Sequence, residues 1–222
     1  MTQSNAPSLA AALSHDHFLI RQKVLKLFGQ AFHVYDAGGN VVLYCKLKAF
    51  KLKEDISLFA GEGQQVPLMR IKGRSIIDFA AAYDVLDLTA PTSGFSSGQT
   101  LEYAAHPDGG AKIGALRRKG FSSLFRDAWE ILDPGDRVIG TISEDSGLKA
   151  FVRRWVDAAS MFMPQAFHAE VGGKRVFEMR QNFNPFVRKM TCDFSGDPSH
   201  TLDRRLGMAA AVLLMAVEGR QG

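Results

Sequence analysis

Short stretches of alternating apolar and polar residues follow one another along most of the chain, and turn residues separate them. The clearest case is 32–44, where two such stretches flank Asp-Ala-Gly-Gly-Asn at 36–40. These residues tolerate the positive φ angles of tight hairpins. Further turn residues lie at 108–110, 133–136 and 171–174. Several strands at this spacing predict an antiparallel barrel or sandwich.

Two segments inside this pattern have a helical character instead. Residues 52–59 contain Lys-Glu-Asp-Ile and suit one or two helical turns. Residues 146–156 place apolar side chains three or four positions apart, which is the spacing of one helix face. We expect both segments to be short helices that interrupt the strands.

The strongest helix signal is the C-terminal stretch 202–217. Thr201 or Asp203 suits its N-cap, and between Leu206 and Val217 the residues are apolar on every side. Such a helix must be surrounded by lipid or by protein. Its length of about 24 Å is short for a bilayer but suits the axis of a small closed barrel. The pattern therefore predicts a β-barrel wrapped around a buried C-terminal helix.

The composition is that of a globular chain. Of the 222 residues, 46% are hydrophobic and 23% are charged, which is close to the average. A chain of this length can bury a sizeable core without disulfides or metals. Residues 1–17 are small and polar, with a weak helical signal at 10–12, and we expect a flexible tail. Residues 18–222 contain no linker and are expected to form one domain.

Cysteine usage and the N-terminus indicate the compartment. Cys45 and Cys192 each lie in an apolar, strand-like stretch, so we expect two buried free thiols, as in a reducing compartment. The N-terminus lacks the basic start and apolar core of a secretory signal. No apolar run reaches the roughly 20 residues that span a bilayer. These features predict a cytoplasmic protein.

The basic residues are the best candidates for function. With 27 basic against 23 acidic residues, the net charge is +4, a mild excess that favours anionic partners and also serves solubility. Arg70, Lys72 and Arg74 alternate with apolar residues, so in a strand they would share one face. Lys46 and Lys48 alternate in the same way.

A third basic group, at the end of another predicted strand, completes the set. If the three groups adjoin in the fold, they form a patch that suits a phosphate-bearing ligand at a membrane surface. The alternative is that these side chains are the outward faces of strands, where Lys and Arg prevent edge pairing and keep the barrel soluble. The candidate residues are Lys46, Lys48, Arg70, Lys72, Arg74, Arg117, Arg118 and Lys119.

Arg204 and Arg205 lie at the start of the predicted C-terminal helix. Cations near a helix N-terminus are unfavourable unless they have partners. We therefore expect them to pair with carboxylates at the barrel mouth, with a charged rim that binds an anion as the alternative.

Enzyme motifs are missing from the sequence. It contains no Gly-x-Ser-x-Gly elbow, no Walker A loop, no dinucleotide-binding glycine pattern after a strand and no His-Glu-x-x-His. His15 and His17 flank Asp16 in the manner of a metal pair, but histidines in a tail are expected to be solvated. We predict no catalytic residue, no metal ligand and no cofactor.

Six runs, in this order along the chain, carry a family resemblance. They are Phe-Lys-Leu-Lys-Glu-Asp-Ile at 50–56, Leu-Met-Arg-Ile-Lys-Gly-Arg at 68–74, Ile-Gly-Ala-Leu-Arg-Arg-Lys-Gly at 113–120, Asp-Ala-Trp-Glu-Ile-Leu-Asp at 127–133, Gln-Asn-Phe-Asn-Pro-Phe at 181–186 and Leu-Asp-Arg-Arg-Leu-Gly-Met-Ala-Ala-Ala at 202–211. With them, the chain resembles the LURP-one-related family, in the superfamily of the tubby C-terminal domain and the phospholipid scramblases. The resemblance implies a twelve-stranded closed antiparallel barrel around the hydrophobic C-terminal helix.

The same resemblance suggests a role at membranes. Tubby domains bind phosphoinositides through basic surface residues, whereas scramblases are assigned calcium-dependent lipid movement. The chain lacks the proline-rich N-terminus and the clustered cysteines of scramblases, and no segment matches their calcium motif. No lipid-contacting residue of tubby can be carried over by motif.

We therefore expect a non-enzymatic barrel module that binds anionic phospholipid or phosphoinositide headgroups at a membrane surface. The alternative is a soluble protein-interaction or structural module without a lipid role. A scramblase-like protein and an enzyme without a recognisable motif are further alternatives. Nucleic acid is disfavoured as a partner, because stacking surfaces add exposed aromatic residues to their basic ones, and a barrel core would claim the phenylalanines near the basic groups.

Overall fold

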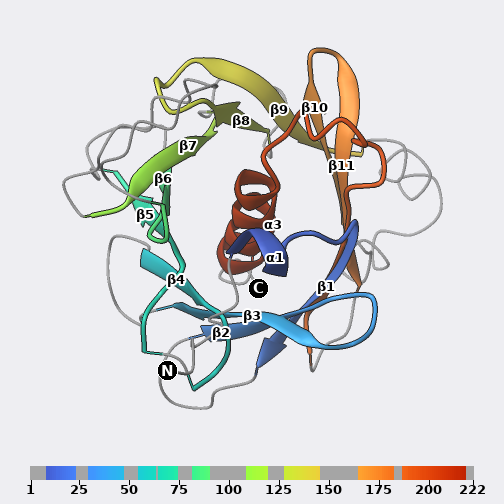
Figure 1. The fold of residues 1–222 in the computed structure, drawn as a ribbon. Coiled ribbons are helices and arrows are strands. Elements are labelled where there is room, and N and C mark those ends of the chain that lie inside the picture. The colour runs from blue at the N-terminus through green and yellow to red at the C-terminus, as the bar shows by residue number, and fades with distance from the viewer. Residues whose placement is uncertain are drawn as a thin grey trace.

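Twelve strands of the computed structural model form a closed antiparallel barrel, and a C-terminal helix lies inside it (Figure 1). The fold class predicted from the sequence is confirmed. The structure describes residues 9–23, 30–47, 55–63, 65–74, 82–90, 109–119, 128–145, 165–182 and 187–218. The elements are α1 (Leu9–Ala12), β1 (His17–Lys23), β2 (Gln30–Tyr35), β3 (Val41–Leu47), β4 (Asp55–Phe59), β5 (Met69–Gly73), β6 (Ala82–Asp87), β7 (Ala111–Arg118), β8 (Trp129–Leu132), β9 (Val138–Glu144), β10 (Ala166–Val171), β11 (Lys174–Asn182), β12 (Lys189–Asp193) and α3 (Arg204–Glu218).

Neighbouring strands in the chain pair with each other, and the barrel closes where β1 pairs with β12. The hairpin predicted at 32–44 is confirmed as β2 and β3. In its turn, the backbone N–H of Asn40 donates to the Asp36 carboxylate at 2.8 Å, and Gly39 has a φ of 80°. The hairpins around 133–136 and 171–174 are confirmed as β8–β9 and β10–β11.

The core is the space between the barrel wall and α3. All residues of α3 from Leu206 to Ala216 are buried, as their apolar character predicts. The two cysteines are also buried, and both are free. Burial raises the pKa of the thiols of Cys45 and Cys192, so they are unreactive apolar side chains. In the described part of the chain, no helix is both long and apolar enough to cross a membrane.

The helix expected at 52–59 is wrong where the structure describes it. Residues 55–59 form β4, which pairs with β3 and β5. Ile56 and Leu58 point into the core, while Asp55 and Ser57 are half-buried on the outer wall. A short apolar run does not separate helix from strand by periodicity, and here the hydrogen-bond partners on both sides decide. The helix expected at 146–156 lies outside the described residues.

The expected N-terminal tail packs against the barrel from Leu9 onward. Leu9 and Leu13 are 1% and 3% exposed and belong to the same apolar cluster as α3. In Figure 1, α1 lies over the end of α3. The segment that follows α1 is held by Arg204 of α3. The Arg204 guanidinium donates to the Asp16 carboxylate at 2.5 Å and to the carbonyl oxygen of His15.

The paired state expected for Arg204 and Arg205 is confirmed. Arg204 pairs with Asp16. Arg205 binds Asp87 at the end of β6 at 2.5 Å and Asp203 at 2.5 Å. These ion pairs fix the first turn of α3 to the barrel mouth, and they leave the two arginines compensated rather than open to an anion.

Candidate functional site

The basic residues chosen from the sequence lie on β3, β5 and β7, largely as their alternation predicts. Lys46 is exposed on β3. Arg70 and Lys72 are half-buried on the outer face of β5, between inward-facing Met69 and Ile71. The register places Lys46 and Arg70 on either side of one residue of β4. Lys48 lies outside the described residues.

In the third basic group, only Arg117 is placed beside the others by the register, because Ala82 of β6 lies between Arg74 and Arg117. Arg117 at the end of β7 pairs across the sheet with Glu130 of β8, on the outer wall. Arg118 pairs with Trp129, which is buried. Arg118 therefore occupies the opposite face of the strand from Arg117. Lys119 follows the strand and is exposed.

Carboxylates already compensate most of these cations. Arg70 lies 3.6 Å from Asp55. Arg117 lies 2.6 Å and Lys119 3.9 Å from Glu130. Lys72 and Arg118 also have partners. An anionic ligand at this wall would have to compete with the protein's own carboxylates.

Arg74 belongs to a four-residue ion-pair network. Its guanidinium binds Asp84 at 2.6 Å and also Asp136. Lys112 binds the same two carboxylates at 3.3 Å and 2.8 Å. Burial alone would raise the pKa values of Asp84 and Asp136, but the two cations hold both below their usual range. The two positive and two negative charges of the network balance. Because its members come from different elements, the network joins β6 and β7 to the β8–β9 turn.

Acid is expected to destabilise the protein through this network. Because folding lowers the pKa values of Asp84 and Asp136, the unfolded chain binds more protons than the folded protein in the acid range. The stabilisation is therefore complete above about pH 5 and is lost progressively as the pH falls through the ordinary aspartate pKa of about 4 and then the lowered values of the folded protein. Urea denaturation at a series of pH values should show the free energy of unfolding falling over this interval.

The Asp84→Asn/Asp136→Asn double variant tests the source of that acid sensitivity. It should lose about 2 kcal/mol at pH 7, since the buried Lys112 keeps no charged partner in the network, and its acid slope should be shallower. Glu170→Gln, outside the network, is the matched control and should keep the wild-type slope. Parallel acid curves for the wild type and the double variant would place the acid sensitivity elsewhere.

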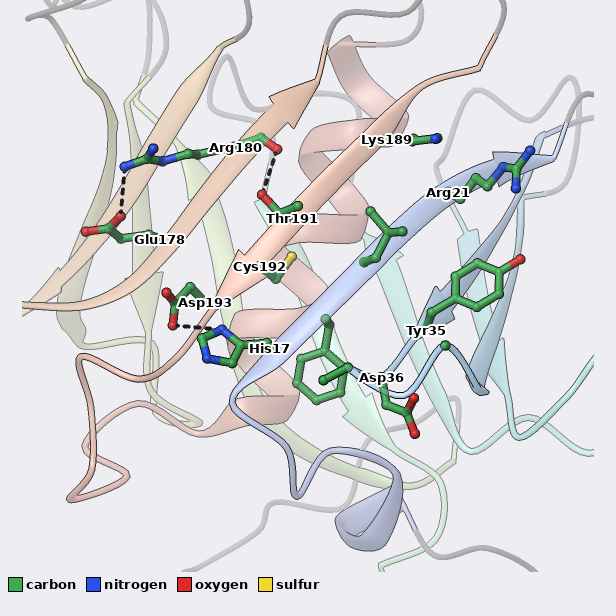
Figure 2. Close-up of a pocket in the computed structure, with 14 residues that line it drawn as sticks. His17, Arg21, Tyr35, Asp36, Glu178, Arg180, Lys189, Thr191, Cys192 and Asp193 are labelled. Carbon is green, nitrogen blue, oxygen red and sulfur yellow. Dashed lines mark hydrogen bonds and ion pairs between the residues drawn. The ribbon is translucent and has the colours of Figure 1, made fainter.

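A groove of about 780 Å³ lies on the outer wall where the first and last strands meet. Its walls come from β1, β2, β11 and β12, together with the turn after β2 (Figure 2). We call it the seam groove. The cross-strand register divides it into three rows. Arg21 faces Lys189 at one end, Leu19 lies between Thr191 and Tyr35 in the middle, and Asp193 faces His17 at the other end.

The acidic end of the seam groove is satisfied by its own neighbours. Asp193 lies 3.4 Å from His17 and accepts the backbone N–H of Ser195 at 2.8 Å. Partial burial would raise the pKa of Asp193, but Ser195 and the nearby charges lower it overall. Glu178 lies 3.6 Å from Arg180. The side-chain amide and backbone N–H of Asn40 lower the pKa of Asp36.

The basic end has no such compensation. Arg21 is exposed and Lys189 is half-buried, and neither has an ion pair or side-chain hydrogen bond within the described residues. Like charges directly opposite each other on adjacent strands are destabilising. We call this pair the seam cations, and an anion bound between them would relieve their repulsion.

Sequence reasoning missed the seam cations. Arg21 alternates with Lys23, and Lys189 directly follows Arg188, but neither pair was among the basic groups chosen from the sequence. The seam cations come from opposite ends of the chain, and barrel closure alone makes them neighbours. The alternation of β1 and β12 predicts that each faces outward, but not that they face each other.

The histidines considered for a metal do not come together. His15 lies 3.9 Å from Asp36, and His17 lies 3.4 Å from Asp193. Throughout the described residues, no three histidine, cysteine or acidic side chains gather as a metal would require. Both histidines instead connect the segment after α1 to the rim of the barrel.

No family model matches the chain, and no curated protein or solved structure matches it either. The family resemblance therefore rests on the six runs of sequence. The architecture that this resemblance implies is the one observed, a closed antiparallel barrel of twelve strands with a C-terminal helix.

Proposed function

We propose that this protein is a LURP-one-related barrel that binds the anionic headgroup of a phospholipid at a membrane surface, without catalysis. The seam cations, Arg21 and Lys189, would hold the headgroup. The observation that carries the proposal is their uncompensated, face-to-face position in the seam groove. An anion between them would relieve the repulsion and bind two cations at once.

The seam groove also supplies an apolar contact beside the cations. Each basic residue near an anionic bilayer contributes roughly 1 kcal/mol, so two contribute about 2 kcal/mol, which is weak attachment by itself. Leu19 and Tyr35 are half-buried in the middle of the groove. A tyrosine with an apolar neighbour suits the membrane interface, where one end of the side chain is apolar and the other is wet. We propose peripheral attachment from the cytoplasm.

The carboxylates of the groove support a binding role rather than a catalytic one. The two whose pKa values are lowered, Asp36 and Asp193, are held by turn residues, Asn40 and Ser195. These hydrogen bonds shape the ends of strands. A general acid or base would instead need a pKa moved toward neutrality.

Liposome flotation tests the proposal. The wild type should bind vesicles that carry phosphatidylglycerol, cardiolipin or phosphoinositide, but not neutral vesicles, and should bind less at physiological than at low salt. The Arg21→Ala/Lys189→Ala variant should bind about 30-fold more weakly, which corresponds to about 2 kcal/mol. The matched control is Arg137→Ala/Lys174→Ala, which removes the same charge from exposed positions outside the groove.

Three results would contradict the proposal. Equal losses of vesicle binding in the seam and control variants would mean that binding depends only on the net charge of the protein. The headgroup site would lie on β3 and β5 if the seam variant kept vesicle binding and the Lys46→Ala/Arg70→Ala variant lost it. Binding of no vesicle at either salt would favour the protein-interaction alternative, for which Val138 and Ile139 at the start of β9, 50% and 37% exposed, are the first surface to test.

A further inference from the structure

We infer that the seam groove selects a headgroup with one phosphate on a neutral polar body, and that it disfavours headgroups with several phosphates. The inference rests on the proposed function and names the ligand class for the same site. It follows from the number and the positions of the charges in and around the groove.

The charges that line the groove leave room for one anionic group. The lining cations are Arg21, Arg180 and Lys189, and the lining carboxylates are Asp36, Glu178 and Asp193. Arg180 is paired with Glu178 at 3.6 Å, and Figure 2 shows its guanidinium directed at that carboxylate. The seam cations are the remaining positive charges in the lining. Both side chains can donate to the oxygens of one phosphate group.

Carboxylates border the seam cations on two sides. Along β12, Asp193 follows Lys189 by four residues, a distance of about 13 Å along the strand. Across β2, His33 is the register partner of Arg21, and its Nε2 lies 3.1 Å from Glu62, which also pairs with Lys23 of β1. A second phosphate on the same ligand would move away from the cations toward one of these carboxylates. It would find no free cation within the lining, because these carboxylates and their own partners occupy the remaining charged positions.

The middle of the groove suits a neutral polar body. Leu19, Tyr35 and Thr191 carry no charge and form one cross-strand row. The Thr191 hydroxyl donates to the carbonyl oxygen of Arg180 at 3.3 Å and keeps lone pairs for a ligand hydroxyl. The Tyr35 hydroxyl has no hydrogen bond within the described residues and can donate. A glycerol unit beside one phosphate meets these groups, as in phosphatidylglycerol.

The experiment compares vesicles of equal surface charge. One set carries phosphatidylglycerol, and the other carries a smaller fraction of phosphatidylinositol 4,5-bisphosphate that gives the same total charge. The wild type should bind the phosphatidylglycerol vesicles at least threefold more tightly. A preference for the bisphosphate vesicles would overturn the inference. The proposed function would stand in that case, provided that Arg21→Ala/Lys189→Ala still loses binding to both sets.

A charge-neutralising variant tests the cause. Glu178→Gln frees Arg180 and should improve binding to the bisphosphate vesicles about tenfold, while binding to phosphatidylglycerol changes less than threefold. Glu170→Gln is the matched control, since it removes one carboxylate of β10 that does not line the groove, and it should leave the preference unchanged. Equal gains in both variants would mean that net charge sets the preference, which overturns the inference.

Soluble probes separate a lipid from a free phosphate compound. Glycerol 3-phosphate should shift the NMR signals of Arg21, Tyr35 and Thr191, and inositol 1,4,5-trisphosphate should do so more weakly. Shifts with glycerol 3-phosphate but no vesicle binding would overturn the lipid proposal and keep the single-phosphate preference. If vesicles bind but the trisphosphate shifts these signals more strongly, the single-phosphate preference is wrong.

Discussion

Replacing Ala210 with Arg should prevent the protein from folding. Ala210 is 2% exposed in the middle of α3, with buried residues before and after it. In the described residues, the buried charged side chains are Asp84, Asp87, Lys112 and Asp197, and none of them belongs to α3. A guanidinium at position 210 would lie in the core without a carboxylate supplied by the helix that carries it.

The expected cost is comparable to the whole stability of a domain. An unpaired buried charge costs several kcal/mol, and a side chain this large must also displace packed neighbours, which costs about 1–3 kcal/mol more. Domains are stable by only about 5–15 kcal/mol in total. We therefore expect the Ala210→Arg variant to be found in the insoluble fraction, or to lack the cooperative melting of the wild type in circular dichroism.

Ala10→Arg is the matched control for this variant. Ala10 lies on α1 and is exposed, so its replacement introduces the same side chain at a helical alanine without burying it. This control should be soluble and should melt like the wild type. A soluble Ala210→Arg variant with the wild-type melting temperature would mean that α3 does not occupy the barrel axis.

A methyl group added at Gly114 should have the second largest effect. Gly114 lies on β7, where the wall approaches α3. A Cβ at this position would lie 2.5 Å from the carbonyl oxygen of Leu132 and 2.9 Å from the side chain of Leu206. Leu132 belongs to the adjacent strand and Leu206 to α3, so the methyl group would be wedged between the wall and the helix. The backbone oxygen cannot move without disturbing the pairing of β7 with β8.

Gly114→Ala should therefore lose about 3 kcal/mol of stability, which lowers the melting temperature by roughly 6–12 °C in a chain of this size. Gly63→Ala is the matched control, since nothing lies within 4 Å of a Cβ built at Gly63 and its φ is not positive. It should change stability by less than about 0.5 kcal/mol. Thermal unfolding followed by circular dichroism measures both. Equal melting temperatures for Gly114→Ala and Gly63→Ala would show that β7 can move away from α3 to accommodate the methyl group.

The charged residues of the outer wall differ in how far neighbouring carboxylates compensate them. On β5 to β7, cations and carboxylates alternate across strands and compensate each other, as in the network of Arg74, Asp84, Lys112 and Asp136. On the seam of β1 and β12, Arg21 and Lys189 keep their charge available. Counting basic residues in the sequence therefore overestimates the free positive charge on β5 to β7 and overlooks that on the seam of β1 and β12.

The candidate site shows why charge patterns along a chain are weak predictors. Alternation correctly predicts that Arg70 and Lys72 face outward, because successive side chains of a strand point to opposite faces. It does not predict that Asp55 lies beside Arg70, because that contact depends on the register between β4 and β5. Compensation of a charge is a property of the neighbouring strand. The same holds for Arg74 and Asp136, which are 62 positions apart in the chain.

The sequence by itself determined the hairpins, the burial of α3 and the outward direction of the basic residues. These features depend on local turn chemistry, on the period of the apolar residues and on the apolar surface of one helix, all of which can be read within a few neighbouring residues. The assignment of 55–59 failed because a run of five residues fits either period, and only its partners β3 and β5 make it a strand.

Only the tertiary structure decided where charges are free. Closure of the barrel places Arg21 opposite Lys189, two residues from opposite ends of the chain. The same closure creates the seam groove, whose walls come from the first and last strands. The physical reason is that electrostatic compensation depends on distances of a few ångströms, and these distances are set by strand register and closure rather than by separation along the chain.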